Sequence, residues 1–144
     1  MENIKFRNAE IKDFEEFNKI YVKTIFLGEN WQSIFPNKPK EYKEFVQLVK
    51  NEEIIIMLFS EKIIGYAIVK AYDDGECIIK DIYILKEFQN RGFGRKFVNF
   101  IEKDAKKIGM KFISLMSVTM QTDRVWERLG YCSKNLSEEY IKYL

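Results

Sequence analysis

The feature that most constrains the fold of this chain is a strand that leads through a glycine turn into a helix. Residues 81–85 read Asp-Ile-Tyr-Ile-Leu, a composition that favours a β-strand. Residues 89–94 read Gln-Asn-Arg-Gly-Phe-Gly, and beyond them apolar side chains recur at helical spacing as far as Ile108. A strand followed closely by a helix is a building unit of α/β domains, so we predict a fold of this class.

The turn at residues 89–94 has the properties of a phosphate site. Glycines at positions 92 and 94 let the backbone approach a ligand closely. The first N–H groups of the following helix have no partner within it, and the helix dipole adds positive potential there. Arg91 and Arg95 stand where they could add charge-assisted hydrogen bonds to a phosphate. The same spacing is equally compatible with a tight turn whose arginines are solvated.

Two other nucleotide-binding patterns are absent. A dinucleotide fold would show Gly-x-Gly-x-x-Gly early in the chain with an acidic residue on the following strand. A P-loop would show Gly-Lys-Ser or Gly-Lys-Thr. Neither pattern occurs in the sequence.

Periodicity along the rest of the chain predicts an ordered series of strands and helices. We expect strands at residues 3–8, 53–60, 62–71, 76–85, 111–118 and 140–144, with further β-rich sequence after Tyr131. We expect helices at residues 13–28, 39–50, 93–108 and 124–129. The first helix is predicted to begin with a capping box, in which Asp13 accepts from a backbone N–H and Glu16 reaches back, and to stop at Gly28. This order makes an α/β domain with a mixed sheet.

Size and composition indicate one water-soluble globular domain over residues 1–144. Of the 144 residues, 47% are apolar and 32% charged, and a single core can bury most of the apolar surface. The longest apolar run, residues 54–59, is far shorter than the roughly 20 residues that a membrane-spanning helix needs. The N-terminal residues show no signal-peptide pattern, so we expect a cytoplasmic protein that binds no membrane.

The charged and nucleophilic residues exclude several classes of function. A net charge of +2, with acidic and basic residues interspersed, argues against nucleic-acid binding. The chain has no histidine, which excludes His-containing zinc sites and nucleophiles activated by imidazole, and we expect no metal. Its two cysteines, Cys77 and Cys132, are expected to be reduced thiols.

Residues 81–94 resemble motif A of the Gcn5-related N-acetyltransferases, the GNAT family. That motif is Arg or Gln, two residues, Gly, one residue, then Gly or Ala, after a strand of the form I-Y-V. Residues 125–131, Val-Trp-Glu-Arg-Leu-Gly-Tyr, resemble motif B, usually written F-Y-E-K-L-G-F. The order of elements is similar over almost the whole chain. The resemblance implies the GNAT fold: a mixed, mostly antiparallel central sheet of six to seven strands, about four flanking helices and a V-shaped cofactor cleft.

The resemblance also implies an activity, the transfer of an acetyl group from acetyl-CoA to a primary amine. The CoA pyrophosphate would lie on the turn, and the pantetheine would pair with the backbone of the preceding strand. The N–H of Ile84 would polarise the thioester carbonyl and stabilise the oxyanion. The cofactor-binding residues implied in this way are Ile82, Tyr83, Ile84, Gln89, Asn90, Arg91, Gly92, Phe93, Gly94, Arg95 and Thr119, the last of which could equally cap the short helix that follows.

The expected proton donor departs from the family pattern. Most members carry a tyrosine in motif B that protonates the departing thiolate, and Trp126 occupies that position here. An indole N–H can donate a hydrogen bond to sulfur but is too weak an acid to protonate it. The thiolate could leave unassisted or take its proton from water, or Tyr131, Cys132 or Tyr83 could come close enough to donate.

The acceptor side is less constrained by the sequence. Asp81 could bind a cationic acceptor or relay its proton through water, or it could simply pair with Lys80. Trp31 and Phe35 either shape an acceptor pocket or belong to the core. We therefore predict an acetyl-CoA-dependent N-acetyltransferase that is a monomer or a homodimer. The alternative, suggested by Trp126, is a catalytically silent acyl-CoA-binding module.

Overall fold

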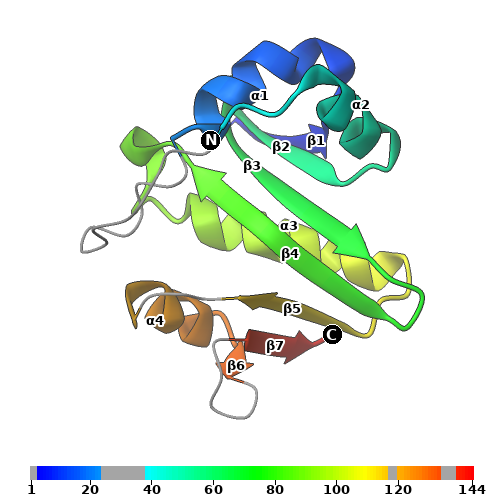
Figure 1. Ribbon diagram of the computed structural model, residues 1–144. Helices are drawn as coiled ribbons and strands as arrows, with labels where there is room; N and C mark the ends of the chain where they lie inside the picture. The colour runs from blue at the N-terminus through cyan, green and yellow to red at the C-terminus, as the bar shows by residue number, and fades with distance from the viewer. Residues whose placement is uncertain (1–2, 24–37, 117–119, 134–138) are drawn as a thin grey trace. The chain divides into compact units, whose positions relative to one another are not determined.

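The structure is a computed structural model that describes residues 3–23, 38–116, 120–133 and 139–144 (Figure 1). Within these residues, strands form a sheet in the order β1-β2-β3-β4-β5-β7-β6. β4 and β5 are parallel, whereas β1–β2, β2–β3, β5–β7 and β6–β7 are antiparallel pairs. The seven strands are β1 (Ile4–Asn8), β2 (Ile54–Phe59), β3 (Lys62–Ala71), β4 (Glu76–Ile84), β5 (Phe112–Met116), β6 (Cys132–Ser133) and β7 (Glu139–Tyr143).

The helices of the described residues complete the predicted order. They are α1 (Phe14–Tyr21), α2 (Tyr42–Lys50), α3 (Phe93–Lys107) and α4 (Met120–Arg128), with the short 3-10 helices η1 (Ile11–Asp13) and η3 (Lys86–Phe88). A mixed, mostly antiparallel sheet of seven strands with four α-helices confirms the predicted fold class. None of the helices described here is long and apolar enough to cross a membrane.

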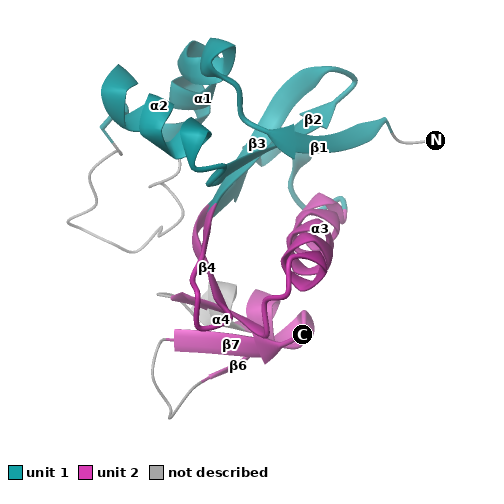
Figure 2. Ribbon diagram, turned by 90° about the vertical axis from the view of Figure 1, so that its right-hand side faces the viewer, with its two compact units in different colours: residues 1–68, 82–91 teal, residues 69–81, 92–144 magenta. Residues whose placement is uncertain are grey.

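The chain divides into two compact units that alternate along the sequence (Figure 2). The first unit comprises Met1–Ile68 and Ile82–Arg91, and the second comprises Val69–Asp81 and Gly92–Leu144. The backbone therefore passes between the units three times, once within β3, once within β4 and once in the glycine turn.

Aromatic side chains hold α1 and α2 against β3 in the first unit. The ring of Phe17 lies 5.3 Å from that of Phe45 and 5.0 Å from that of Tyr66, measured between centroids. All three side chains are buried. The carboxamide of Asn18 accepts from the backbone N–H of Lys40 at 2.9 Å and donates to its carbonyl at 3.1 Å. Ring packing and these two bonds fix the pair of helices that the apolar spacing predicted.

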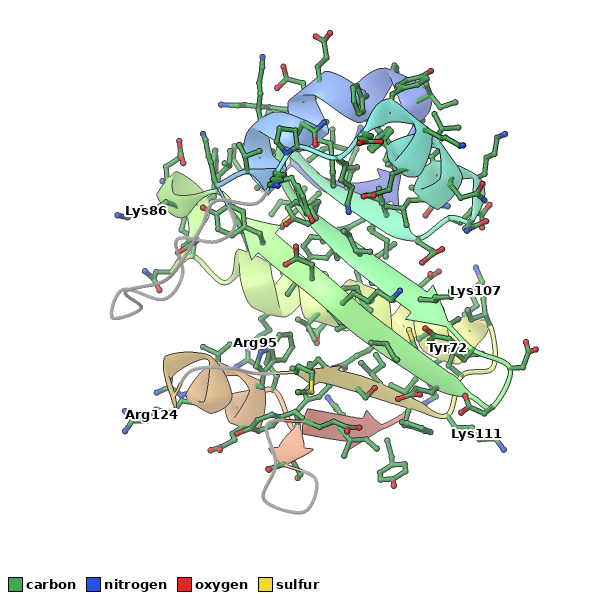
Figure 3. The ribbon with its side chains drawn as sticks, in the orientation of Figure 1. Tyr72, Lys86, Arg95, Lys107, Lys111 and Arg124 are labelled. Atoms are coloured by element: carbon green, nitrogen blue, oxygen red, sulfur yellow. The ribbon has the colours of Figure 1, made fainter. Side chains whose placement is uncertain are left out.

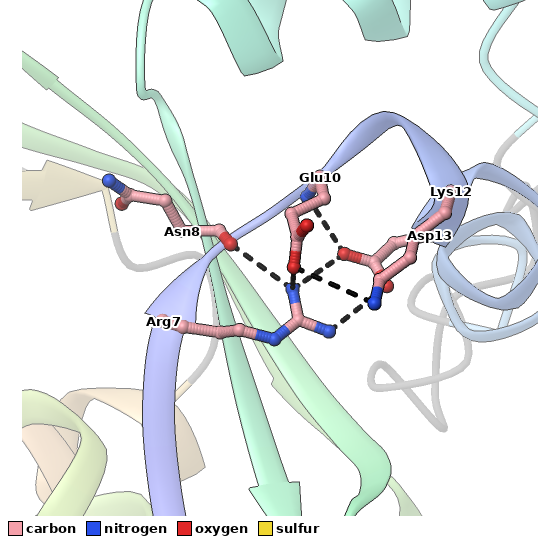
Figure 4. A network of polar contacts seen from close by, with 5 residues as sticks. All are labelled: Arg7, Asn8, Glu10, Lys12 and Asp13. Atoms are coloured by element: carbon pink, nitrogen blue, oxygen red, sulfur yellow. Dashed lines mark hydrogen bonds and ion pairs between the residues drawn. The ribbon is translucent and has the colours of Figure 1, made fainter.

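The start of α1 differs from the predicted capping box (Figure 4). Asp13 accepts from the Glu10 N–H at 2.8 Å and from the two terminal nitrogens of Arg7 at 2.7 and 3.1 Å. Glu16 accepts from Lys19 instead of reaching back. The prediction was wrong because a buried carboxylate gains more from a bidentate guanidinium than from a single N–H of its own helix. Asp13 thus ties η1 to β1.

The predicted length of the first helix is tested only in part. α1 ends at Tyr21, and Val22 and Lys23 form a turn. The predicted stop at Gly28 and the two aromatic residues Trp31 and Phe35 lie outside the described residues.

A tight hairpin and a bulge shape β3 in the first unit. Ser60 and Glu61 join β2 to β3 with positive φ values of 48° and 70°, the backbone that a type I′ turn requires. The register shifts between Met57 and Leu58, because β3 carries Ile64 as an extra residue at this point. Gly65 follows the extra residue directly.

The second unit contains the helix that follows the glycine turn. α3 buries one face, made of Phe93, Phe97, Val98, Ile101 and Ala105. Arg95 near its start and Lys107 at its end, both labelled in Figure 3, are exposed. Gly109, with a φ of 89°, ends the predicted segment. This helix connects two parallel strands, β4 and β5, which a tight turn cannot do.

Candidate functional site

Two backbone contacts at the end of β4 show which edge faces β3. The Leu85 N–H donates to the Ile64 carbonyl oxygen at 2.8 Å. The Tyr83 carbonyl oxygen lies 2.6 Å from the point where a Cβ on Gly65 would stand, so the strands approach closely here because Gly65 has no side chain. The Leu85 N–H and the Tyr83 carbonyl therefore both face β3.

Ile84 consequently presents its own N–H and carbonyl to the opposite edge of β4. No peptide bond of the described residues is cis, and a trans peptide sets the Ile84 N–H opposite to the Tyr83 carbonyl. The same rule sets the Ile84 carbonyl opposite to the Leu85 N–H. An N–H fixed in direction on a rigid strand can stabilise a negative charge that develops beside it.

Burial varies among the side chains at the end of β4. Tyr83 and Ile84 are buried, and Asp81 and Ile82 are half-buried. Burial raises the pKa of the Tyr83 hydroxyl, and the Glu87 carboxylate adds to the shift. The phenol is therefore protonated at neutral pH and is a weaker acid than a free tyrosine.

The turn after β4 combines left-handed backbone with the start of α3. Asn90 and Gly92 have φ values of 62° and 83°. Gly92 is the N-cap of α3, and the Lys96 N–H donates to its carbonyl at 3.2 Å. The backbone dipoles of α3 place positive potential at this end of the helix. The first turn of α3 contains no acidic residue, so its side chains do not oppose an anion.

The glycine and arginines of the turn are exposed. A Cβ built on Gly92 would meet no atom within 4 Å. The guanidinium carbon of Arg91 lies 5.5 Å from the centroid of the Phe88 ring, which packs 5.6 Å from the ring of Phe59. Arg91 thus combines an aromatic support with an exposed charge. Arg95 is exposed on α3.

Sequence reasoning missed the role of one side chain in this turn. Gln89 was predicted to contribute its backbone to a phosphate site, and its side chain donates from Nε2 to the Ile84 carbonyl oxygen at 2.8 Å. The lone glycine inside an apolar strand, Gly65, was the available signal that two backbones approach closely here. No pattern in the sequence indicated the Gln89 contact.

Tyr131, a candidate proton donor, is a buried part of the second unit. Its side chain is 1% exposed, and its hydroxyl donates to Glu102 Oε2 at 2.9 Å. Burial, together with the negative charge of Glu102, raises the pKa of this phenol well above its ordinary value. Lys142 contacts the same carboxylate at 3.1 Å and donates to the Leu129 carbonyl at 2.9 Å. The contacts of Tyr131 therefore argue for a structural role.

Trp126 packs beside Tyr131 in the second unit. The two rings meet edge to face, 5.3 Å apart between centroids, and Trp126 is 8% exposed. The Tyr131 N–H also donates to the Trp126 carbonyl at 3.0 Å. The structure thus brings these two predicted catalytic residues together. The other predicted site residues divide between the two units. The first unit contains Ile82, Tyr83, Ile84, Gln89, Asn90 and Arg91, and the second contains Asp81, Gly92, Phe93, Gly94 and Arg95. Thr119 lies outside the described residues.

Comparison with known proteins identifies the class to which this fold belongs. The chain resembles PaiA N-acetyltransferase from Thermoplasma acidophilum in complex with coenzyme A, with a TM-score of 0.78, 13% identity and coverage of 96% of each chain. It also resembles a phosphinothricin acetyltransferase from Sinorhizobium meliloti in complex with AcCoA, with a TM-score of 0.76, 15% identity and coverage of 98% of this chain and 88% of the other. At these identities the likeness establishes a shared fold.

The family follows from a match of sequence. The model of the acetyltransferase (GNAT) family matches residues 14–131, and this chain belongs to that family. No curated protein sequence matches the chain significantly. The predicted resemblance is therefore confirmed at the level of family and fold.

Proposed function

We propose that this protein transfers the acetyl group of acetyl-CoA to a primary amine of a small-molecule or protein acceptor. The observation that carries the proposal is the direction of the Ile84 N–H, which points to the edge of β4 opposite β3. Family membership supports it, because the GNAT family is a family of acetyltransferases. We propose that residues 1–144 act as one N-acetyltransferase domain.

The residues at the end of β4 and in the turn fit an acyl-CoA. Two exposed arginines, Arg91 and Arg95, and the positive end of the α3 dipole, with no acidic residue in the first turn, suit the pyrophosphate and ribose phosphate. The backbone of Ile82 and Ile84, at the edge of β4 opposite β3, would pair with the pantetheine amides as an added strand does, whereas the Tyr83 carbonyl faces β3. Bound acetyl-CoA supplies a thioester, whose C–S bond breaks as the C–N bond forms.

The chain's own groups account for charge and geometry in this reaction. The Ile84 N–H stabilises the negative charge that develops on the thioester oxygen, and it is oriented before the substrate binds. The incoming amine must be neutral to attack. Asp81, half-buried on β4, is our candidate to attract a cationic acceptor or to pass its proton to water.

The departing thiolate requires little help. A thiolate is a modest base, so it can leave unprotonated or take a proton from water. Trp126 can donate its indole N–H to the sulfur without transferring a proton. We assign no proton transfer to Tyr131, because its hydroxyl donates to Glu102.

The second candidate function is a silent acyl-CoA-binding module. It is favoured by Trp126 at the position of the usual tyrosine and by the engagement of Tyr131 with Glu102. Such a module would bind acetyl-CoA without transferring the acetyl group. Trp126→Tyr distinguishes the two candidates, because the restored phenol can raise the rate of an enzyme but leaves a silent module inactive.

The test is amine-dependent release of CoA from acetyl-CoA, measured with a thiol reagent over a panel of primary amines and peptides. Acetyl transfer predicts release above the amine-free background and an N-acetylated product by mass spectrometry. Tight binding of acetyl-CoA with no release for any amine, in both the unmodified protein and Trp126→Tyr, would establish the silent module. Failure to bind CoA at millimolar concentration would overturn both candidates.

We further propose a cytoplasmic protein that binds neither nucleic acid nor membrane and is a monomer or a homodimer. The small net charge of +2 supports the absence of a nucleic-acid partner. Light scattering coupled to size-exclusion chromatography would measure the oligomeric state.

A further inference from the structure

The end of β4 is held at both sides of one peptide unit. The peptide that joins Ile84 to Leu85 donates its N–H to the Ile64 carbonyl oxygen at 2.8 Å. Its carbonyl accepts from Gln89 Nε2, also at 2.8 Å. Both bonds lie within the first unit. Rotation of this peptide plane would lengthen both bonds at once, so its orientation is fixed from two sides.

This peptide adjoins the N–H that the proposed reaction uses. The Ile84 N–H belongs to the preceding peptide, and only the φ and ψ angles of Ile84 separate the two planes. Because the N–H and the carbonyl of one strand residue point to the same edge, Gln89 reaches the edge at which the Ile84 N–H is presented. The Gln89 side chain therefore binds the carbonyl of Ile84, the same residue whose N–H is the proposed oxyanion donor.

The hydrogen bond from Gln89 also changes the electrostatics of that edge. An unbonded carbonyl oxygen carries partial negative charge and would oppose a second negative oxygen beside it. A donor on the Ile84 carbonyl offsets this charge and polarises the adjoining peptides.

The backbone around η3 fixes the place from which Gln89 reaches. The Phe88 N–H donates to the Leu85 carbonyl at 2.9 Å, and the Gln89 N–H donates to the Lys86 carbonyl at 3.1 Å. Asn90 follows in the left-handed region, with a φ of 62°. One residue thus joins the end of the strand, through its side chain, to the start of the turn, through its backbone.

We propose that Gln89 is a positioning residue for acetyl transfer, whose carboxamide holds the Ile84 carbonyl and thereby orients the Ile84 N–H toward the thioester oxygen. This inference rests on the proposed function. It gives a task to the side chain of Gln89, whose backbone N–H is bonded to the Lys86 carbonyl at 3.1 Å.

The test compares two substitutions at this position. Gln89→Met keeps the length of the side chain and removes the donor, whereas Gln89→Arg keeps an N–H donor. We expect Gln89→Met to lower kcat about tenfold, with less than about a threefold change in the acetyl-CoA Kd, because the lost contact orients the donor for the transition state. Gln89→Arg should retain kcat within about threefold.

A matched control and an independent readout accompany the rates. Gln47 lies on the exposed surface of α2, where its side chain donates to Asn51 at 3.1 Å, and Gln47→Met should leave kcat unchanged. Amide hydrogen exchange, measured without substrate, should become faster at Leu85, whose N–H is bonded to the Ile64 carbonyl, in Gln89→Met only. Thermal unfolding of each variant identifies any that fails to fold.

The outcomes separate this inference from the proposed function. A drop in kcat with Gln89→Met, rescued by Gln89→Arg and joined by faster exchange at Leu85, supports the positioning role. Unchanged kcat and unchanged exchange in a folded Gln89→Met protein would overturn it while leaving the proposed function intact. Absence of turnover in the unmodified protein would overturn the proposed function and this catalytic role together.

Discussion

Two side-chain hydrogen bonds, one in each unit, differ in what they leave available for chemistry. In the first unit, Gln89 donates to the Ile84 carbonyl at 2.8 Å, and the Ile84 N–H remains directed to the edge of its strand. In the second unit, Tyr131 donates its phenolic proton to Glu102 at 2.9 Å from a fully buried position. We call the first the edge bond and the second the core bond. The edge bond leaves the Ile84 N–H available for the reaction. The core bond uses the phenolic proton of Tyr131, a predicted catalytic residue, in a buried contact with Glu102.

The largest effect is expected from a substitution in the turn that follows the edge bond, measured as a loss of acetyl-CoA binding. Gly92→Glu places a carboxylate where a Cβ now meets no atom within 4 Å, at a residue with a φ of 83°. Its negative charge would oppose the phosphates of CoA at the start of α3, and we expect acetyl-CoA binding to weaken at least about 100-fold. Isothermal titration calorimetry measures the Kd.

The chain offers a matched control for this substitution. Gly109, just beyond the other end of α3, has a φ of 89° and equally open space around a built Cβ. Gly109→Glu therefore imposes similar backbone strain with the same added charge. Equal loss of binding in both variants would show that strain or charge in general, and not the turn, is responsible.

The next largest effect is expected from a substitution that removes the core bond and leaves the edge bond in place. Tyr131→Phe removes the donor from Glu102, which keeps Lys142 at 3.1 Å. We expect the free energy of unfolding to fall by about 1–2 kcal/mol, because a partly desolvated carboxylate loses one hydrogen bond. Urea denaturation measures this change, and kcat should stay within about twofold.

The rate of this variant also decides the role of the tyrosine. A general acid typically contributes about 100-fold to 10,000-fold to the rate. A fall of that size in kcat, in a Tyr131→Phe protein that is folded at the assay temperature, would contradict the structural role and restore Tyr131 as the proton donor.

A smaller effect tests whether every polar contact of the first unit affects catalysis. Asp13→Asn breaks the bidentate contact with Arg7 at 2.7 and 3.1 Å, away from the edge bond. We expect about 1 kcal/mol of lost stability at pH 7, since Arg7 is partly exposed and solvent screens the pair. Acetyl transfer should be unchanged, and a loss of kcat would remove the distinction drawn for the edge bond.

The pH dependence of this loss follows from the pKa of Asp13. Burial alone would raise it, but the hydrogen bonds from Arg7 and the Glu10 N–H outweigh burial and hold it below its ordinary value of 3.8. A depressed pKa stabilises the fold above the unfolded value, and that stabilisation disappears as the pH falls through the folded pKa. The difference between wild type and Asp13→Asn should be constant near neutrality and shrink below about pH 4.

The fold was largely predictable because its signals are local. Apolar periodicity located the strands and helices, and the glycines at 92 and 109 marked the bounds of α3. The capping of α1 was not predictable, because Asp13 is bound by Arg7 of β1, which periodicity does not place beside it. Local rules cannot weigh a partner supplied by tertiary structure.

The candidate site was predictable at the backbone and less so at its side chains. Glycines before a helical pattern predicted a turn at residues 89–94, and the structure has left-handed backbone there at Asn90 and Gly92, followed by α3 from Phe93. The edge bond depends on how η3 returns Gln89 to β4, and the core bond depends on α3 and Tyr131 meeting in space. Both contacts come from packing, which the sequence pattern does not specify.

The most direct measurement is an acetyl-CoA titration followed by amide chemical shifts in 15N-labelled protein. We expect the largest shifts at Ile84 and at residues 89–94, with the amides of Glu102 and Tyr131 nearly unchanged. Shifts confined to other parts of the chain, or no shift at the turn with millimolar acetyl-CoA, would contradict it.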